Sequence, residues 1–285
     1  MDSKSEDGAL EQASSDGDGV NAHSRYSFDV RSGLDVEVRS ASGDLRVVRA
    51  EGLRCEVRLS TDDPDAQKRL ARAECSYDPA TNRLLVDTGA GFRMHASEPG
   101  FRKVLSHFRE TMRHDVDVEL MLPTPASIKF ASASGDLRCE SDVQDVEVTN
   151  ASGNVHVAQV GGDLRFRSAS GDIVAGEVVG AVESKTVSGD VALGRVHGGA
   201  NVQSVSGDVS LSLDRAVSAS VNTVSGDVRV GVVAGLFIDV DANTVSGELS
   251  SEIALDGAQS GSADESIRLR VRTVSGDLKV QRLAQ

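Results

Sequence analysis

The chain is poor in aromatic side chains: among its 285 residues there is no tryptophan, and aromatic residues make up only 3%. Hydrophobic residues still account for 39%, which is enough for a packed core and excludes an intrinsically disordered protein. An interior without large rings has to be filled by small and β-branched side chains, which suit β-strands. The composition therefore favours a thin, sheet-lined interior over a wide globular core.

Cysteine is also scarce. Cys55, Cys75 and Cys139 form an odd, widely spaced set that matches neither a disulfide framework nor a metal site. The start of the chain lacks a basic patch followed by an apolar run, so no signal peptide is predicted. The longest apolar stretch, near residues 228–240, is too short and interrupted to span a bilayer. These features predict idle thiols and a reducing, cytoplasmic location.

Positive charge is in the minority, with 30 Lys and Arg against 44 Asp and Glu, and the net charge is −14. Nucleic acid binds proteins largely through its phosphates, which need basic side chains. A strongly acidic molecule repels such a partner. Nucleic acid is therefore excluded as a partner for the molecule as a whole.

The chain is rich in one repeated phrase, in which a small apolar residue precedes Ser-Gly, an acidic residue or Asn, and an aliphatic residue. Its serines follow one another at intervals of 18, 18, 18, 18, 19, 21 and 29 residues. They are Ser134, Ser152, Ser170, Ser188, Ser206, Ser225, Ser246 and Ser275. A fixed period of this kind indicates a repeat architecture, in which each unit covers the apolar side of the next.

Each unit predicts two short strands and two turns. In the unit that begins at Ala169, Ser170-Gly171-Asp172 is turn chemistry, because glycine tolerates positive φ and Asp or Ser can bond nearby backbone. Ile173 and Ala175 then alternate with their neighbours at the period of a strand, and Gly180 marks a second turn. The units lack the length and periodicity of helices. The predicted fold class is all-β, a β-solenoid (single-stranded β-helix) of about 18-residue coils.

Stacked coils would align their inward side chains in columns. The first expected column is Ala133, Ala151, Ala169, Val187, Val205, Val224, Val245 and Val274. The second is Leu137, Val155, Ile173, Val191, Val209, Val228, Leu249 and Leu278, and the third is Cys139, Val157, Ala175, Leu193, Leu211 and Val230. The opposite wall would hold Val146, Val148, Leu164, Phe166, Val182, Ala200 and Val202.

Composition divides the chain into three regions. Residues 1–24 are mostly Asp, Glu, Ser and Gly and predict a disordered acidic tail. Residues 25–130 predict a small α+β, β-rich capping region, with a short helix over 63–72 capped by Asp62-Asp63-Pro64 and a hairpin of residues 74–77 with 84–87. Residues 131–285 form the solenoid repeat region, from which a polar loop over 257–265 is expected to project.

The segment 99–113 interrupts the β pattern and predicts an inserted amphipathic helix, because Phe101, Val104, Leu105, Phe108 and Met112 recur at helical spacing. Residues 89–114 carry a net charge of +3 in an otherwise acidic chain. One interpretation is a surface helix that packs on the solenoid as a cap or lid. The other is a docking helix for an acidic protein partner or an anionic membrane. Its partner-binding residues would be Phe101, Arg102, Lys103, Phe108, Arg109, Met112 and Arg113.

The repeated turn offers a second candidate site, because stacking would align its acidic residues in a row. In one interpretation each carboxylate accepts hydrogen bonds from turn backbone, which outweighs a repulsion of under about 1 kcal/mol between neighbouring charges in water. In the other, calcium bridges the carboxylates as in Gly-Gly-x-Gly-x-Asp repeats, although Asn154 and Glu248 interrupt the row. The calcium row would consist of Asp136, Asp172, Asp190, Asp208, Asp227 and Asp277.

No residue pattern indicates catalysis, and the sequence predicts neither an enzyme nor a cofactor. A nucleophile needs one special environment beside a base, whereas the eight serines occupy equivalent turns and only His156 and His197 lie in the repeats. A carbohydrate-active β-helix would need a local acidic groove and exposed aromatic rings. The repeats offer only Phe166 and Phe237 for that purpose.

Three phrases, at residues 186–191, 223–228 and 273–278, read Thr-Val-Ser-Gly-Asp followed by Val or Leu. They resemble a widespread bacterial family, a domain of unknown function with β-strand repeats that is often labelled "putative adhesin". The resemblance covers roughly Phe28 to Leu283 and implies a β-solenoid and a bacterial origin. It supplies no catalytic residues, and the segment 101–113 lies beyond the pattern of the family.

The leading functional hypothesis is a non-catalytic scaffold or protein-interaction module built on the β-solenoid. Open solenoid edges invite pairing with further strands, so end-to-end self-association is expected. The first alternative is an adhesin or calcium-binding repeat module at the cell surface. The second alternative is the carbohydrate-active β-helix.

Overall fold

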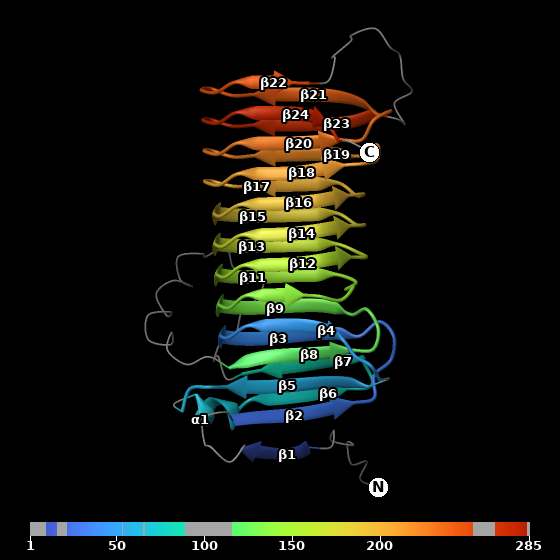
Figure 1. Cartoon of the computed structure of the whole chain (residues 1–285), viewed down its shortest axis with the longest axis vertical. Coiled ribbons are helices and arrows are strands. Elements are labelled where there is room, and N and C mark those ends of the chain that lie inside the picture. The colour runs from blue at the N-terminus through green and yellow to red at the C-terminus, as the bar shows by residue number, and fades with distance from the viewer. Residues whose placement is uncertain are drawn as a thin grey trace. The chain divides into compact units, whose positions relative to one another are not determined.

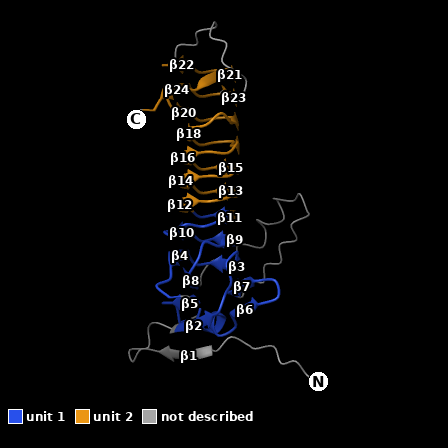
Figure 2. Ribbon diagram, turned by 90° about the vertical axis from the view of Figure 1, so that its right-hand side faces the viewer, with its two compact units in different colours: residues 1–144, 149–153 blue, residues 145–148, 154–285 orange. Residues whose placement is uncertain are grey.

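The computed structural model describes residues 10–15, 22–52, 54–64, 66–88, 116–252 and 266–283. In these ranges the chain forms strands joined by short turns, with one short helix (Figure 1). It divides into two compact units, residues 1–144 with 149–153 and residues 145–148 with 154–285 (Figure 2). Strand β11 (Val146–Ser152) contributes residues to both.

The first unit contains ten strands in the part of the chain that the structure describes. They are β1 (Leu10–Ser15), β2 (Ala22–Phe28), β3 (Asp35–Ser42), β4 (Leu45–Arg49), β5 (Cys55–Thr61), β6 (Glu74–Asp78), β7 (Arg83–Asp87), β8 (Asp117–Leu122), β9 (Ser127–Ser134) and β10 (Leu137–Cys139). Helix α1 (Gln67–Leu70) lies between β5 and β6.

Two sheets run through the first unit, in the orders β1-β2-β5-β8-β4-β10 and β9-β3-β7-β6. The pairs β1–β2, β2–β5 and β5–β8 are antiparallel, whereas β8, β4 and β10 pair in parallel. The predicted hairpin is confirmed as the antiparallel pair β6–β7. Its turn ends at Asn82, which has a φ of +53° and accepts a hydrogen bond from the Tyr77 hydroxyl at 2.8 Å.

Two expectations for this unit are wrong. The stretch 1–24, predicted to be a disordered tail, contains strand β1 and the start of β2, so the prediction fails for residues 10–15 and 22–24. The helix predicted over 63–72 is reduced to Gln67–Leu70, and Ala66, not an Asp side chain, is its N-cap. Asp63 instead contributes its carbonyl, which accepts from the Ala66 N–H at 3.0 Å. The inserted helix predicted over 99–113 lies outside the described residues.

The second unit contains thirteen described strands besides its part of β11. They are β12 (Val155–Val160), β13 (Leu164–Ser170), β14 (Ile173–Val178), β15 (Val182–Ser188), β16 (Val191–Val196), β17 (Ala200–Gln203), β18 (Val209–Leu213), β19 (Ser218–Asn222), β20 (Val228–Val232), β21 (Phe237–Asn243), β22 (Leu249–Ser251), β23 (Ser266–Arg272) and β24 (Leu278–Arg282).

These strands form the predicted β-solenoid. Each coil places one strand in each of two parallel sheets, and successive coils stack in register (Figure 1). Ile173 lies beside Val191, and Val191 beside Val209, so the offset between neighbouring coils equals the 18-residue sequence period. Each 18-residue coil therefore consists of two short strands and two turns, as the repeats predict.

The interior is filled by the aliphatic columns that the sequence predicts, with one exception. The second and third columns and the opposite wall are buried, apart from Leu249 in the last-stacked coil. The first column is wrong beyond Ala133: Ala151 and Ala169 are only partly buried, and Val187, Val205, Val224, Val274 and Val245 are exposed. The preceding hydroxyl residue faces inward in its place, as Thr186, Ser204, Thr223 and Thr273 do.

A local hydrogen bond explains this reversal of sides. The Thr186 hydroxyl donates to the carbonyl of Ser188 at 3.2 Å, and Thr223 and Thr273 make the same bond to Ser225 and Ser275 at 3.3 and 3.2 Å. Because the threonine is buried, its hydroxyl needs a partner, and a buried hydroxyl without one would cost more than burial of a methyl group gains. The hydroxyl residue therefore takes the inner position and the valine the outer one.

The last coils do not stack in sequence order. The sheet orders end in β20-β24-β22 and β19-β23-β21, so the coil β23–β24 lies between β19–β20 and β21–β22 (Figure 1). The chain leaves β20, forms the outermost coil first, and then returns to fill the level between. Arg282 of β24 donates to the carbonyls of Val233 and Leu236 at 2.8 and 3.1 Å, which ties the inserted coil to the connector that passes it.

Candidate functional site

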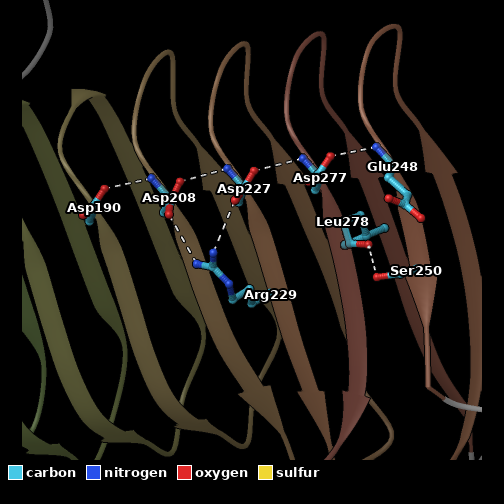
Figure 3. A network of polar contacts seen from close by, with 8 residues as sticks. All are labelled: Asp190, Asp208, Asp227, Arg229, Glu248, Ser250, Asp277 and Leu278. Atoms are coloured by element: carbon cyan, nitrogen blue, oxygen red, sulfur yellow. Dashed lines mark hydrogen bonds and ion pairs between the residues drawn. The ribbon is translucent and has the colours of Figure 1, made fainter.

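The Ser-Gly-Asp corner carries a continuous column of carboxylates in the second unit. Each aspartate of the column accepts a hydrogen bond from the backbone N–H of its counterpart one level along, as the Asp190 carboxylate does from Asp208 N at 2.8 Å (Figure 3). The further bonds are Asp227 N to Asp208, Asp277 N to Asp227, and Glu248 N to Asp277, at 2.9, 3.0 and 2.8 Å. The column (Asp190, Asp208, Asp227, Asp277 and Glu248) is thus part of the backbone bonding of the stack.

Earlier levels make the same bond. Asp172 donates its N–H to the Asn154 side-chain oxygen at 3.0 Å, and Asp190 donates to Asp172 at 2.8 Å. In the first unit Asp136 N donates to Asp44 at 2.9 Å. Asn154, which interrupts the acidic row in the sequence, therefore performs the same structural task as the aspartates. The interpretation in which the row bonds to turn backbone gains direct support.

The described residues contain no group of three or more His, Cys, Asp or Glu side chains arranged to hold a metal ion. In the second unit, each member of the predicted calcium row accepts a backbone N–H with one carboxylate oxygen; these members are Asp172, Asp190, Asp208, Asp227 and Asp277. Arg229 also contacts two of them, Asp208 and Asp227, each at 3.3 Å (Figure 3).

An exposed row of valines lies on the same turns as the carboxylates. We define the valine ridge as Val187, Val205, Val224, Val274 and Val245, in their spatial order. The carbonyls of the first four valines each accept the N–H of the next level's serine, as Val187 does from Ser206 at 2.9 Å and Val205 from Ser225 at 2.9 Å. The first four are 47 to 49% exposed and Val245 is 83% exposed. The ridge is a contiguous apolar strip, which marks an interaction surface more often than scattered apolar residues do.

The terminal coil, β21 with β22, has an open apolar side. Its inward residues Ile238, Val240 and Ala242 are partly exposed, whereas their neighbours in β23, Ile267, Leu269 and Val271, are buried. Leu249 of β22 is 49% exposed, while its neighbour Leu278 is 2% exposed. Among the described strands β21 and β22 end their sheets, so each has an edge whose backbone groups no described strand pairs.

The opposite corner of the solenoid holds a histidine between two carboxylates. His197 Nε2 lies 2.8 Å from Glu177 Oε1, and Nδ1 lies 2.9 Å from Asp214 Oδ1. The second contact lacks the alignment of a hydrogen bond, so it is a short electrostatic contact. Sequence reasoning missed this cluster, although the offsets of 20 and 17 residues lie close to the coil period. The imidazole thus contacts side chains from the coils on both sides of its own, which helps to hold the three levels together.

The three cysteines are free thiols. Burial raises the pKa of the Cys55, Cys75 and Cys139 thiols to about 12. A thiol with such a pKa is almost entirely protonated at neutral pH and is a poor nucleophile and a poor metal ligand. This agrees with the interpretation of idle thiols.

The partner-binding residues predicted in the segment 99–113, Phe101, Arg102, Lys103, Phe108, Arg109, Met112 and Arg113, all lie outside the described residues. The polar loop predicted over 257–265 does so too. Within the described ranges, no helix has the length and apolar character needed to cross a membrane.

Comparison with known proteins points to one family and one fold. The model of the Toastrack family DUF4097 matches residues 87–281. Two structures from Parabacteroides distasonis, one described as a putative adhesin and one as a putative lipid binding protein, are each 14% identical to the chain, with TM-scores of 0.53 and 0.52; each alignment covers 94% of this chain and 98% of the other. A putative adhesin from Bacteroides fragilis, also 14% identical, has a TM-score of 0.50 and covers 90% of this chain and 96% of its own. Among curated proteins none matches.

Proposed function

The chain belongs to the Toastrack family DUF4097, and we propose that it is a non-catalytic scaffold that assembles end to end with further copies of itself. The observation that carries the proposal is the open terminal coil, β21 with β22. Solenoids protect their ends with caps that present a polar outer face. This coil instead presents a partly exposed apolar interior and two strand edges, which is the combination that pairs with another chain.

The apolar residues of the terminal coil supply the driving force. Ile238 and Val240 gain cover when a second coil is placed on them, as Ile267 and Leu269 are covered in the coil beneath. Burying an aliphatic side chain fully stabilises by about 1.5–3 kcal/mol, and the strand edges that no described strand pairs would join a further strand at the same time. Asp239 and Asp241 point outward from the same strand and contact Arg268 and Arg270 of β23 at 3.9 and 3.1 Å, which reduces the repulsion between two such edges.

A scaffold also fits the rest of the molecule. The imidazole of His197 joins Glu177 and Asp214 of neighbouring levels, which suits a role in the cohesion of the stack, and the three thiols have raised pKa values. A reducing cytoplasmic setting suits three unpaired cysteines, and cell fractionation that found the protein at the surface would contradict that location.

The test is sedimentation velocity over about 1–100 μM protein, the range in which weak assembly becomes visible. We expect the sedimentation coefficient of the wild type to rise with concentration. The variant Ile238→Lys/Val240→Lys places two charges on the open side of the coil, as natural edge strands do, and should remain monomeric. A matched control, Val174→Lys/Gln203→Lys, adds the same charge at exposed positions within the stack and should assemble like the wild type.

Two results would sink the proposal: a wild type that stays monomeric throughout, or a terminal-coil variant that assembles as the wild type does. Circular dichroism and the protection of β23 amides from hydrogen exchange report whether the stack beneath the substituted coil is intact. The adhesin alternative rests on the names of structures that share the fold. It predicts binding to a surface ligand by the monomer, unaffected by the terminal-coil substitutions.

A further inference from the structure

The valines of the ridge do not pack into the interior of the solenoid. Behind the first four valines a buried hydroxyl residue fills the inner position, so about half of each of these valine surfaces faces outward, and Val245 is 83% exposed. Five levels in a row nevertheless present the same exposed side chain. At about 4.8 Å between strands, the ridge extends over about 19 Å.

The carboxylate column gives the ridge an acidic flank. Valine and acidic residue are three positions apart on each turn, so both rows follow the same corner from level to level. Of the five carboxylates in the column, Asp208 and Asp227 contact Arg229 (Figure 3). Within residues 116–252 and 266–283, no other basic side chain contacts the column. The surface therefore combines an apolar strip with excess negative charge.

We propose that the valine ridge is a docking site for the segment 99–113 of a second copy of this chain. The sequence predicts that segment as an amphipathic helix, and its composition complements the ridge. Phe101, Val104, Leu105, Phe108 and Met112 form the apolar stripe, and four basic residues against Glu110 give residues 99–113 a charge of +3. The basic side chains, Arg102, Lys103, Arg109 and Arg113, match the acidic flank.

The dimensions agree as well. A helix rises 1.5 Å per residue, so the stripe from residue 101 to residue 112 would extend over about 16 Å, close to the length of the ridge. One helical turn advances about 5.4 Å and one solenoid level about 4.8 Å. Successive turns can therefore place apolar side chains beside four of the five valines with small drift.

Such a contact is heterologous, because the ridge of one copy receives the segment of another. Contacts of this type propagate into open assemblies unless a rotation closes them. The interaction is separate from the end-to-end assembly through the terminal coil, and it stands whether or not that assembly exists.

A complementation experiment tests the proposal. All proteins carry Ile238→Lys/Val240→Lys, which is expected to remove association through the terminal coil, so that the comparison isolates the ridge. The ridge variant adds Val205→Ser/Val224→Ser, and the segment variant adds Arg102→Glu/Lys103→Glu/Arg109→Glu. A control adds Val174→Ser/Val179→Ser, which removes two valines of similar exposure away from the ridge.

Sedimentation velocity should show association of the parent and of the control. Each variant alone should associate about 30-fold more weakly, from the loss of two valine contacts or of three charge contacts. An equimolar mixture should form one-to-one dimers, because one variant retains an intact segment and the other an intact ridge. Raising the salt to 0.5 M, a condition that screens exposed charges, should weaken this dimer by roughly tenfold.

Three results would overturn the proposal. A parent that stays monomeric would exclude docking between copies. This outcome includes the case in which the segment docks on the ridge of its own chain. A mixture that stays monomeric would show that ridge and segment do not meet. If the segment variant alone loses binding to vesicles of phosphatidylcholine and phosphatidylglycerol, while the ridge variant associates like the parent, the segment serves an anionic membrane instead.

Discussion

At the scale of single residues, the glycine of each repeat is fixed by two independent constraints. Gly207 has a φ of +130°, a backbone region that side chains with a Cβ rarely adopt. A Cβ built on it would also lie 2.2 Å from the carbonyl oxygen of Gly189 in the neighbouring coil. The turn therefore needs glycine both for its own geometry and for the close approach of successive levels.

Replacing Gly207 with alanine should destabilise the second unit by about 2–4 kcal/mol, because the coil must separate from its neighbour or distort its backbone. Gly52→Ala is the matched control, because its Cβ would meet nothing within 4 Å and its φ is not positive. That change should stay within about 0.5 kcal/mol of the wild type. The measurement is the midpoint of urea unfolding, and equal midpoints for the two variants would contradict the account.

The same corner shows what the sequence could and could not predict about single residues. The spacing of the repeats alone predicted the turn, its glycine, and the buried columns that begin at Leu137 and Cys139. The side on which Val187 lies did not, because alternation of apolar residues suggests that the valine is buried and the threonine exposed. The hydrogen bond from the Thr186 hydroxyl to the Ser188 carbonyl decides the matter, and a polar contact of this kind is invisible in a hydrophobicity pattern.

At the scale of the repeated turn, the carboxylates of the column accept hydrogen bonds from backbone N–H groups, and these bonds outweigh the repulsion between neighbouring charges. Each acidic oxygen bonds a neighbouring N–H that would otherwise point at the corner without a partner, as Asp208 does for Asp227. Asn154 shows that an amide oxygen can do the same for Asp172. The requirement of the turn is therefore an acceptor at a fixed distance, and the negative charge is a separate property.

Asp208→Asn should therefore retain the stability of the wild type to within about 0.5 kcal/mol, whereas Asp208→Ala should lose about 1–2 kcal/mol with its acceptor. Thermal unfolding followed by circular dichroism makes the comparison. The same pair separates the two interpretations of the row. If calcium bridges the carboxylates, millimolar calcium should raise the melting temperature of the wild type and not of Asp208→Asn.

The order of the last coils illustrates a second limit of the sequence. The phrases at Val245 and Val274 are near-equivalent, and intervals of 21 and 29 residues fit either a simple continuation or a return. Only contacts between levels decide between them: Asp277 N bonds Asp227, and Glu248 N bonds Asp277. The repeat pattern predicts that coils stack, but it carries no information about which of two similar coils comes next.

At the scale of the whole second unit, a stack of similar coils gains its stability from contacts between neighbouring levels. A coil in the middle has two neighbours and a coil at an end has one. The terminal coil, β21 with β22, should therefore open most easily, and its partly exposed residues agree with a lower local stability.

Hydrogen exchange followed by mass spectrometry should detect the lower stability of the terminal coil, because the order of amide protection should not follow the order of the coils in the sequence. At low micromolar concentration, amides of residues 237–251 should exchange faster than those of residues 266–282, although the latter lie nearer the C-terminus. Stacking in sequence order would give the reverse, because the last coil of the chain would then fray first. At high concentration the protection of residues 237–251 should increase in the wild type and not in Ile238→Lys/Val240→Lys, since assembly supplies the missing neighbour. If the protection of residues 237–251 does not depend on protein concentration, the terminal coil does not pair with another copy, and the proposed end-to-end assembly is wrong.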